Sequence, residues 1–503
     1  MVFALAANFF GSLLPKLIYI LVTPIMVRVL GIEAMGIIGL QVMVVTATSI
    51  FHQSLGKTVN RVCAHSRAQT SPSDARIIAG IEQAFWIIGG GLMLLSGPGA
   101  DLIARDWLGP TKMPHAEVVV SLILIIVMSG FQILQLFYYN GLLGFGRHKA
   151  ANSYTGIGEL LRYGGTIPLL LLFHASLVDV LIWQTALAGL QSLAMVWAFW
   201  RQAPFAHPRT FTMFSALHEI RAFAAGMMII TALAVLTSQA DRLVLSFLMP
   251  LAVFGQYTVI SNLARSVPLL VAPISNVFFP KLTEDLVDPG ADISRDYHKY
   301  AELVAAVSIP PSIFLAAYAH DVLSVYVGAV PWIDQASPAL VLLSFAMMLA
   351  ALYEAPYILQ LAGGWTSLHA KLQGGVLVPL MVTYWILAKL AGSTGVAIAV
   401  LALCVSYLVI GIPIMHRKLL MGQQAIWLKH DILRPVFVTL LSCVLSLAVS
   451  SLFSQPLIRL VVAVPFGLIS MVAICLTGPA TSGFVRGALK YLATRNGATV
   501  QRE

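Results

Sequence analysis

The sequence has 503 residues, of which 59% are hydrophobic and only 10% are charged, and its formal net charge is +9. An ordinary soluble domain has about 25% charged residues, so this composition excludes a soluble globular fold. The apolar residues occur in runs of about 20, which suit membrane-spanning helices, and they lack the alternation of a membrane β-barrel. The sequence therefore predicts an all-α polytopic membrane protein.

Charge clusters and Gly/Pro turns divide the apolar runs into about fourteen transmembrane helices. The first run continues from Ala4 to Val29 with no basic residue before it, which is too long for a cleaved signal peptide. We expect it to be the first span. The predicted spans are 6–29, 36–56, 77–97, 116–139, 151–174, 177–200, 222–247, 252–279, 299–318, 337–361, 366–388, 393–415, 434–453 and 458–477.

The basic residues between spans set the predicted orientation. One set of alternate connections holds nearly all of them, including the segments 57–76, 417–434 and 486–502. Because cytoplasmic loops retain Lys and Arg, we expect both termini in the cytoplasm and an even number of spans. The excess of positive charge is thereby explained without a nucleic-acid partner. The opposite set of connections holds only Arg28, Arg105, Lys112, Lys389 and Arg459.

The chain also contains a weak duplication. Leu30–Gly36 after the first predicted span parallels Met249–Gly255 after the seventh. Six spans separate the copies, so the halves would be parallel repeats, an arrangement that places a substrate path at the interface between them. We predict a six-helix bundle with its cytoplasmic linker at 1–221, a second bundle at 222–415, and two further spans with a basic tail at 416–503.

Several motifs resemble one transporter family. Asn8–Gly39, with Pro24, Arg28 and Gly31, is similar to the first two spans of the polysaccharide and O-antigen flippases of the multidrug/oligosaccharidyl-lipid/polysaccharide (MOP) superfamily. The second half resembles that family more closely, and the similarity covers spans 1 to 12. The motifs that carry this second similarity are Ser238–Arg242, Gly255–Tyr257 and Phe279–Leu282.

The resemblance implies a fold, a cargo and a location. The fold would be two six-helix bundles around a central cavity that opens alternately to each side. The cargo would be an undecaprenyl-diphosphate-linked oligosaccharide for O-antigen, capsule or exopolysaccharide, moved across the bacterial inner membrane. Polysaccharide polymerase and chain-length proteins would be partners.

Charged residues inside the spans mark candidate sites, independently of the resemblance. A charge at mid-membrane costs about 2.5–3.5 kcal/mol on insertion scales, so such residues usually face a bundle interior or a watery cavity. A diphosphate cargo needs cations along its path, and arginine can bind phosphate oxygens with two parallel hydrogen bonds. The candidate substrate-binding residues are Lys16, Arg162, Arg265 and Arg242.

The acidic residues inside the spans are candidates for coupling to a proton or sodium gradient. These candidates are Asp241, Glu354 and Glu159. Two alternatives stay open. Glu159 and Arg162 are three residues apart and could form an internal salt bridge, and Arg242 could extend to the membrane surface.

Other functions have less support. The twelve histidines show no HExxH motif, so the sequence predicts no metal site, no catalytic residue and no cofactor. A drug exporter of the same fold would need an acidic, aromatic cavity for its cationic cargo. A membrane-embedded polymerase or ligase would need a larger external loop than the connections expected at 98–115 and 319–336.

Overall fold

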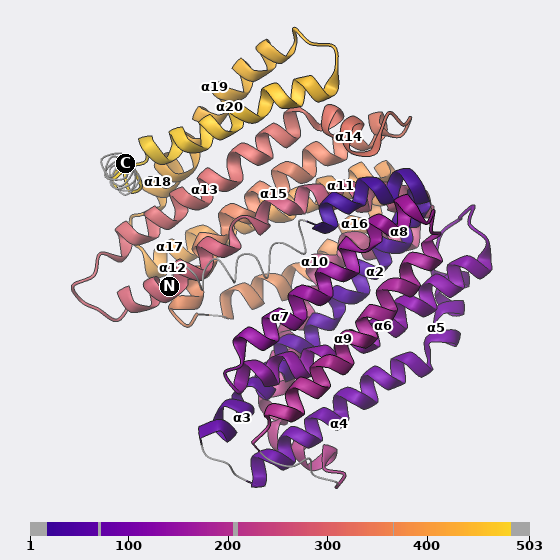
Figure 1. Cartoon of the computed structure of the whole chain (residues 1–503). Coiled ribbons are helices and arrows are strands. Elements are labelled where there is room, and N and C mark those ends of the chain that lie inside the picture. The colour runs from indigo at the N-terminus through magenta and orange to yellow at the C-terminus, as the bar shows by residue number, and fades with distance from the viewer. Residues whose placement is uncertain (1–17, 69–71, 205–209, 366, 484–503) are drawn as a thin grey trace, which may run out of the picture. The chain divides into compact units, whose positions relative to one another are not determined.

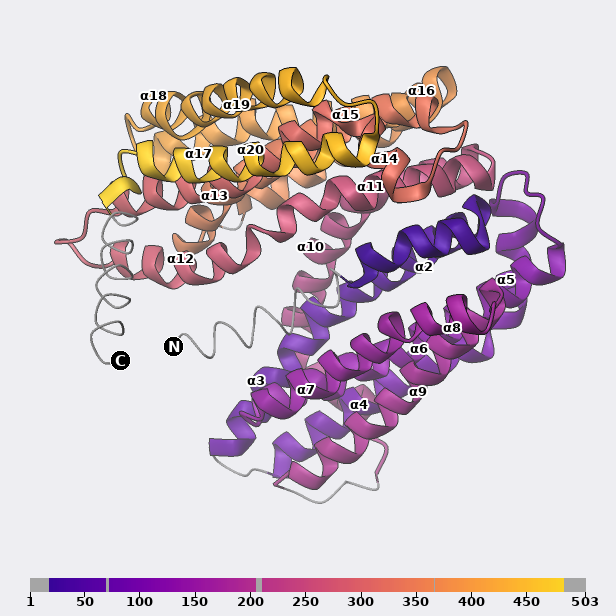
Figure 2. The ribbon, with the colours of Figure 1, turned by 45° about the horizontal axis from the view of Figure 1, so that its top comes forward.

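The computed structural model describes residues 18–68, 72–204, 210–365 and 367–483 (Figures 1 and 2). These residues form helices joined by short loops, and no strand occurs among them. Ten helices are long and apolar enough to span a membrane, and two shorter apolar helices cover Ile18–Leu30 and Ile32–Thr48. The all-α, multi-pass architecture is therefore confirmed, while the exact number of about fourteen spans stays a prediction.

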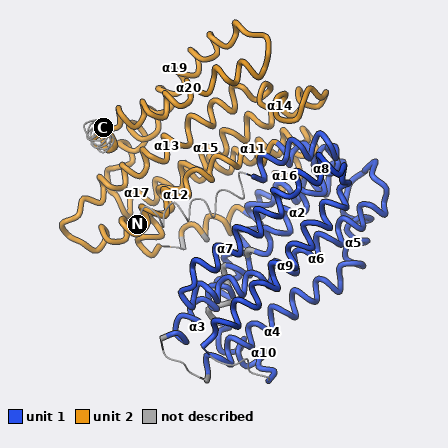
Figure 3. The backbone as a smooth tube through the Cα atoms, viewed as in Figure 1, with its two compact units in different colours: residues 1–259, 377–381 blue, residues 260–376, 382–503 orange. Residues whose placement is uncertain are grey.

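The chain divides into two compact units (Figure 3). Unit 1 contains residues 1–259 and 377–381, and unit 2 contains residues 260–376 and 382–503. The predicted division of the chain at residues 221 and 415 stays a prediction.

In unit 1, helix α6 contacts most of the other helices: α9, α4, α3, α2 and α5. A capping box starts α9, because the Ser176 side chain accepts from the Asp179 N–H and the Asp179 carboxylate accepts from the Ser176 N–H. The elements of unit 1 are α2 Ile32–Phe51, η1 His52–Gly56, α3 Lys57–Ala68, α4 Pro72–Leu94, α5 Ser96–Leu102, η2 Ile103–Trp107, α6 His115–Gly144, α7 His148–Glu159, η3 Leu160–Gly164, α8 Thr166–Leu172, α9 Leu177–Gln202, α10 Met213–Leu248 and the first part of α11 Leu251–Leu269.

In unit 2, helix α13 is the central element and contacts α12, α15, α19 and α20. Asp292 caps α13, since its side chain accepts a hydrogen bond from the Arg295 N–H. The elements of unit 2 are the rest of α11, α12 Ala272–Asp285, α13 Ile293–Ala317, α14 Ala319–Val327, α15 Ile333–Ala362, α16 Ser367–Ser406 apart from residues 377–381, η4 Tyr407–Gly411, α17 Ile412–Leu419, α18 Gln424–Ile426, η5 Trp427–Leu433, α19 Arg434–Ser450 and α20 Pro456–Thr477.

Helix α16 contains a break that the sequence predicts. Its apolar stretch runs from Lys371 to Leu419, which is about twice the length needed to cross a bilayer. The backbone leaves helical geometry at Ala391 (φ −141°, ψ 21°) and at Gly392 (φ 55°, ψ −134°), and the positive φ suits glycine. The expected break between the spans 366–388 and 393–415 is thereby confirmed.

Two connections that we expected to be loops contain helix instead. Residues 96–107 form α5 and the π-helical turn η2, and residues 319–327 form α14. The sequence at the start of α5 is rich in Gly and Pro and therefore predicts a loop. Pro98, however, lies in the first turn of the helix, where backbone N–H groups have no intrahelical acceptor and proline costs little.

The two duplicated turns pack against each other within unit 1. A Cβ atom on Gly36 would lie 2.5 Å from Cδ1 of Leu251 and 2.7 Å from its carbonyl oxygen, and a Cβ atom on Gly255 would overlap the carbonyl oxygen of Ile32. Gly36 corresponds to Gly255 in the duplication, and Ile32 corresponds to Leu251. The contacts are therefore reciprocal, as in a two-fold arrangement, and both positions require glycine.

We expect Gly255→Ala to lower the free energy of unfolding by about 1–3 kcal/mol, because the backbone of α2 leaves no room for a methyl group. A lower unfolding temperature of the detergent-solubilised protein would show this. In the control Gly90→Ala, the new Cβ atom meets no atom within 4 Å, and the higher helix propensity of alanine should make it neutral or stabilising. Equal unfolding temperatures for both variants would contradict the close packing of α2 on α11.

Candidate functional site

Among the predicted substrate-binding cations that the structure describes, Arg162 in unit 1 is the most deeply buried. It lies in the π-helical turn η3, between the short helices α7 and α8. The residue is only 1% exposed. A π-helical turn within a helix is often found at a functional site, and a cation at this depth requires partners.

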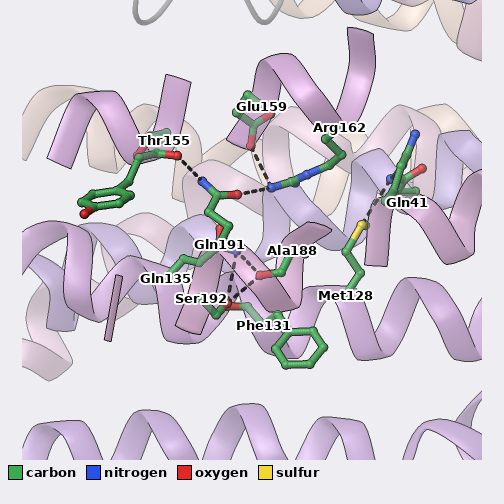
Figure 4. A network of polar contacts seen from close by, with 12 residues as sticks. Gln41, Met128, Phe131, Gln135, Thr155, Glu159, Arg162, Ala188, Gln191 and Ser192 are labelled. Carbon is green, nitrogen blue, oxygen red and sulfur yellow. Dashed lines mark hydrogen bonds and ion pairs between the residues drawn. The ribbon is translucent and has the colours of Figure 1, made fainter. Parts of the chain in front are cut away.

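The partners of Arg162 come from its own helix and from α9. Its Nη2 atom donates to Oε1 of Gln191 at 2.7 Å and lies 3.2 Å from Oε1 of Glu159. Figure 4 shows these three side chains pointing toward one another. Gln191 in turn donates to the carbonyl oxygen of Tyr154 at 3.2 Å. The lack of a side chain at Gly158 leaves the space that the Gln191 amide occupies.

A chain of neutral polar groups extends this network to α2. The Thr166 hydroxyl donates to the carbonyl oxygen of Arg162 at 2.9 Å and accepts from Gln184 at 3.5 Å. Gln184 accepts from Gln41 at 2.7 Å. All three residues are buried. Elements η3, α8, α9 and α2 are thus joined by hydrogen bonds inside unit 1.

The alternative interpretation of Arg162 and Glu159 as an internal salt bridge is therefore confirmed for this conformation. The pair does not use the whole guanidinium group, because its Nε atom is buried without a hydrogen-bond partner among the described residues. Glu159 is about one quarter exposed, unlike Arg162. Contact between Arg162 and an anionic cargo would require a conformation in which the guanidinium group is accessible.

Asp241 and Arg242 lie next to each other in α10 and are both buried. The Tyr257 hydroxyl donates to Oδ2 of Asp241 at 2.6 Å. Arg242 is 2% exposed, and the alternative of its extension to the membrane surface stays a prediction. Burial of both charges agrees with a position inside the bundle.

The remaining candidates are distributed along the chain. Arg265 lies in α11 and Glu354 in α15, both half-buried and both in unit 2. Lys16 lies outside the described residues. The structure therefore brings together Glu159 with Arg162, while the roles of all these residues in binding cargo or a coupling ion stay predictions.

Sequence reasoning from charges missed the amide side chains of the network. Gln41, Gln184 and Gln191 are uncharged, but an amide inside an apolar span also needs a partner.

A second cluster, around Glu82, was also missing from the candidate sites. Oε1 of Glu82 accepts from the Tyr138 hydroxyl at 2.5 Å and from Nε1 of Trp200 at 3.0 Å. These bonds join α4, α6 and α9, and the available signal was the acid itself, which lies within the predicted span 77–97.

No group of three His, Cys, Asp or Glu side chains that could hold a metal occurs within the described part of the chain. The buried side chains around Arg162 form an ion pair and amide hydrogen bonds.

The fold is similar to solved structures of MOP transporters. A structure of the lipid II flippase MurJ in an inward closed conformation matches with a TM-score of 0.69 and 13% identity, covering 92% of this chain and 96% of that chain. An inward-facing multidrug resistance MATE family transporter matches with a TM-score of 0.60 and 16% identity, covering 80% and 94%. An outward-facing MATE transporter matches with a TM-score of 0.52 and 15% identity, covering 82% and 94%.

Sequence comparison identifies the family. No curated protein sequence matches this chain. A family model described as "Polysaccharide biosynthesis protein" matches residues 5–284, which is more than half of the chain. That segment contains the motifs around Arg28, Asp241 and Pro280 that resemble polysaccharide flippases. The chain therefore belongs to the polysaccharide biosynthesis protein family, and its fold is that of the MOP superfamily.

Proposed function

We propose that this protein is a flippase. It moves an undecaprenyl-diphosphate-linked oligosaccharide from the cytoplasmic to the periplasmic leaflet of the bacterial inner membrane, by alternating access. The product serves O-antigen, capsule or exopolysaccharide synthesis, and polymerase and chain-length proteins are the expected partners. Both termini are cytoplasmic. No cofactor is needed, and a proton or sodium gradient would supply the driving force through Asp241, Glu354 or Glu159.

The family match is the observation that carries this proposal, because it associates the chain with polysaccharide biosynthesis. The fold supports transport over catalysis, since the similar structures are a lipid II flippase and MATE transporters. We therefore propose a transporter without enzymatic activity.

The charges within the spans favour an anionic cargo. Arg162 is buried and Arg265 is half-buried within long apolar stretches, and a diphosphate group requires such cations along its path. The alternative is a cation-coupled multidrug exporter, which the MATE fold supports. For that cargo the acids Asp241 and Glu354 would be the binding groups, and Arg162 and Arg265 would repel it.

Complementation separates the two functions. A bacterium without its own flippase would express the wild type, Lys16→Ala or Arg265→Ala, with membrane expression checked. We expect the wild type to restore surface polysaccharide and the two cation variants to lose most of this activity, because each removes a candidate phosphate contact. Thr283→Ala, at an exposed position in α12, is the control and should complement fully.

Absence of rescue by well-expressed wild type, together with resistance to cationic drugs, would assign the exporter function instead. Full rescue by both cation variants would keep the flippase function but remove Lys16 and Arg265 from the cargo path.

A further inference from the structure

A buried histidine in unit 2 is held between two hydrogen-bond acceptors. Nδ1 of His298, on α13, lies 2.6 Å from Oδ2 of Asp431, on η5. Its Nε2 atom lies 3.0 Å from Oε1 of Gln423, just before α18. A carboxylate oxygen and an amide oxygen both accept hydrogen bonds, so both contacts form only when both ring nitrogens carry a proton. The arrangement therefore fits an imidazolium ion.

A neighbouring histidine shows the contrasting arrangement. Nδ1 of His416 lies 3.2 Å from the carbonyl oxygen of Ile412, and its Nε2 atom lies 3.3 Å from the Tyr297 hydroxyl. A neutral ring satisfies both contacts, because Nδ1–H donates to the carbonyl oxygen and Nε2 accepts from the hydroxyl. His298, unlike His416, thus lies between two groups that can only accept hydrogen bonds from it as they are oriented here.

The His298–Asp431 pair is buried but borders a cavity. Asp431 is 1% exposed, yet both residues line a polar cavity of about 1160 Å³ in unit 2. Protons can therefore reach the pair through water without any unfolding of α13.

Other charged groups surround the pair on each element that packs against it. Glu302, one turn further along α13, lies 3.4 Å from Nη2 of Arg434 through its Oε1 atom. Its Oε2 atom accepts from the backbone N–H and hydroxyl of Thr481 at 2.9 and 2.8 Å. Glu302 therefore has its own partners. The other titratable groups near the pair or in its cavity are Asp292, which caps α13, then Arg295, Asp296, Tyr297 and Lys299 on α13, His416 on α17, and His430 on η5.

We infer that His298 and Asp431 form a proton-binding site that holds the segment Gln423–Asp431 against α13. The segment connects α17 to α19, so the site contributes to the attachment of the last two helices of unit 2 to α13. The inference concerns regulation by pH and holds whatever the cargo is.

The sign of the pH effect follows from the hydrogen bonds. When His298 loses its extra proton at higher pH, the ion pair with Asp431 is lost, and Gln423 keeps its hydrogen bond only by turning its amide group. The segment Gln423–Asp431 is therefore held strongly against α13 at lower pH. This contact weakens as the pH rises and His298 loses its extra proton. Protonation of Asp431 at acidic pH also removes the ion pair.

The first test reads the protonation state directly. The full-length protein, with ¹⁵N-labelled histidine and in lipid bilayers, would be studied by magic-angle spinning NMR, and the His298 signals assigned by their loss in His298→Gln. We expect both His298 nitrogens to stay protonated at about pH 7.5, where an ordinary histidine is neutral, and His416 to be the neutral tautomer. A neutral His298 at this pH would overturn the inference.

The second test measures how firmly the segment Gln423–Asp431 is held against α13. Hydrogen exchange of residues 423–433, corrected for the intrinsic effect of pH, would be compared at about pH 6 and about pH 8.5, on either side of the titration expected for histidine. We expect protection in the wild type to fall about tenfold or more at the higher pH, as loss of a charge-assisted hydrogen bond predicts.

Two variants and a control make the second test specific. Asp431→Asn should flatten the pH profile, and Gln423→Glu should move the loss of protection to higher pH, because a second carboxylate stabilises the imidazolium ion. Gln423 is half-buried, so this change is tolerated sterically. His430→Gln, in the same cavity, should keep the wild-type profile. A pH-independent wild type, or an unchanged profile in Asp431→Asn, would refute the site, whereas failure of the flippase proposal would change neither readout.

Discussion

Replacement of Arg162 by leucine should destabilise the protein by about 2–4 kcal/mol. The change leaves the half-buried Glu159 without its ion pair and removes the donor to Gln191. Breaking a fully buried pair costs about 3–5 kcal/mol, and the partial exposure of Glu159 reduces this value. Arg162→Lys should lie between the leucine variant and the wild type, since a single ammonium group cannot reproduce the geometry of the guanidinium group. The unfolding temperature in detergent measures the loss.

A double variant separates a structural role of Arg162 from contact with the cargo. Glu159→Gln combined with Arg162→Gln removes both charges and keeps amides beside Gln191, so it should recover most of the lost stability. If Arg162 binds the cargo, this stable variant should still fail to restore surface polysaccharide in a flippase-null bacterium. Recovery of both stability and transport would show that Arg162 acts only through its salt bridge with Glu159.

The helices of the bundle could be predicted from sequence because burial in a membrane requires long apolar runs. The predicted span 177–200 corresponds to α9 Leu177–Gln202, and the span 458–477 corresponds to α20 Pro456–Thr477. Helices outside the long runs, such as α5 and α14, could not be predicted in this way. The same holds for the π-helical turn at Leu160–Gly164, because it depends on local hydrogen bonding and not on hydropathy.

The candidate site was predictable only in part for a related reason. Glu159 and Arg162 are neighbours on one helix, so their pairing follows from spacing alone. Gln191 reaches Arg162 only because α9 folds back beside η3, and Gln41 reaches Gln184 across 143 positions of the chain. Such contacts depend on tertiary packing, which one sequence does not specify. The site of His298 and Asp431 was missed for the same reason, since 133 positions separate the two residues.

Replacement of Glu302 by alanine should have an equally large effect in unit 2. Glu302 is 1% exposed, forms an ion pair with Arg434 and accepts hydrogen bonds from two groups of Thr481. Its loss leaves a partly buried arginine without its ion pair and the Thr481 N–H without an acceptor, while the Thr481 hydroxyl keeps the Cys475 carbonyl oxygen at 2.9 Å. We expect a cost of about 3–5 kcal/mol. Glu302→Gln keeps one acceptor oxygen and should cost less. The unfolding temperature in detergent again provides the measurement.

A surface ion pair is the matched control for this prediction. Asp334 lies 3.2 Å from His320, but its side chain is 83% exposed, so Asp334→Ala should cost less than about 1 kcal/mol. Equal effects of Glu302→Ala and Asp334→Ala would mean that the charges do not hold α19 and α20 against α13. The attachment would then depend on the apolar cluster that contains Ile309, Ile313 and Cys443. In that case the pH-dependent contact of His298 with Asp431 would be the main polar link between α13 and the segment leading to α19.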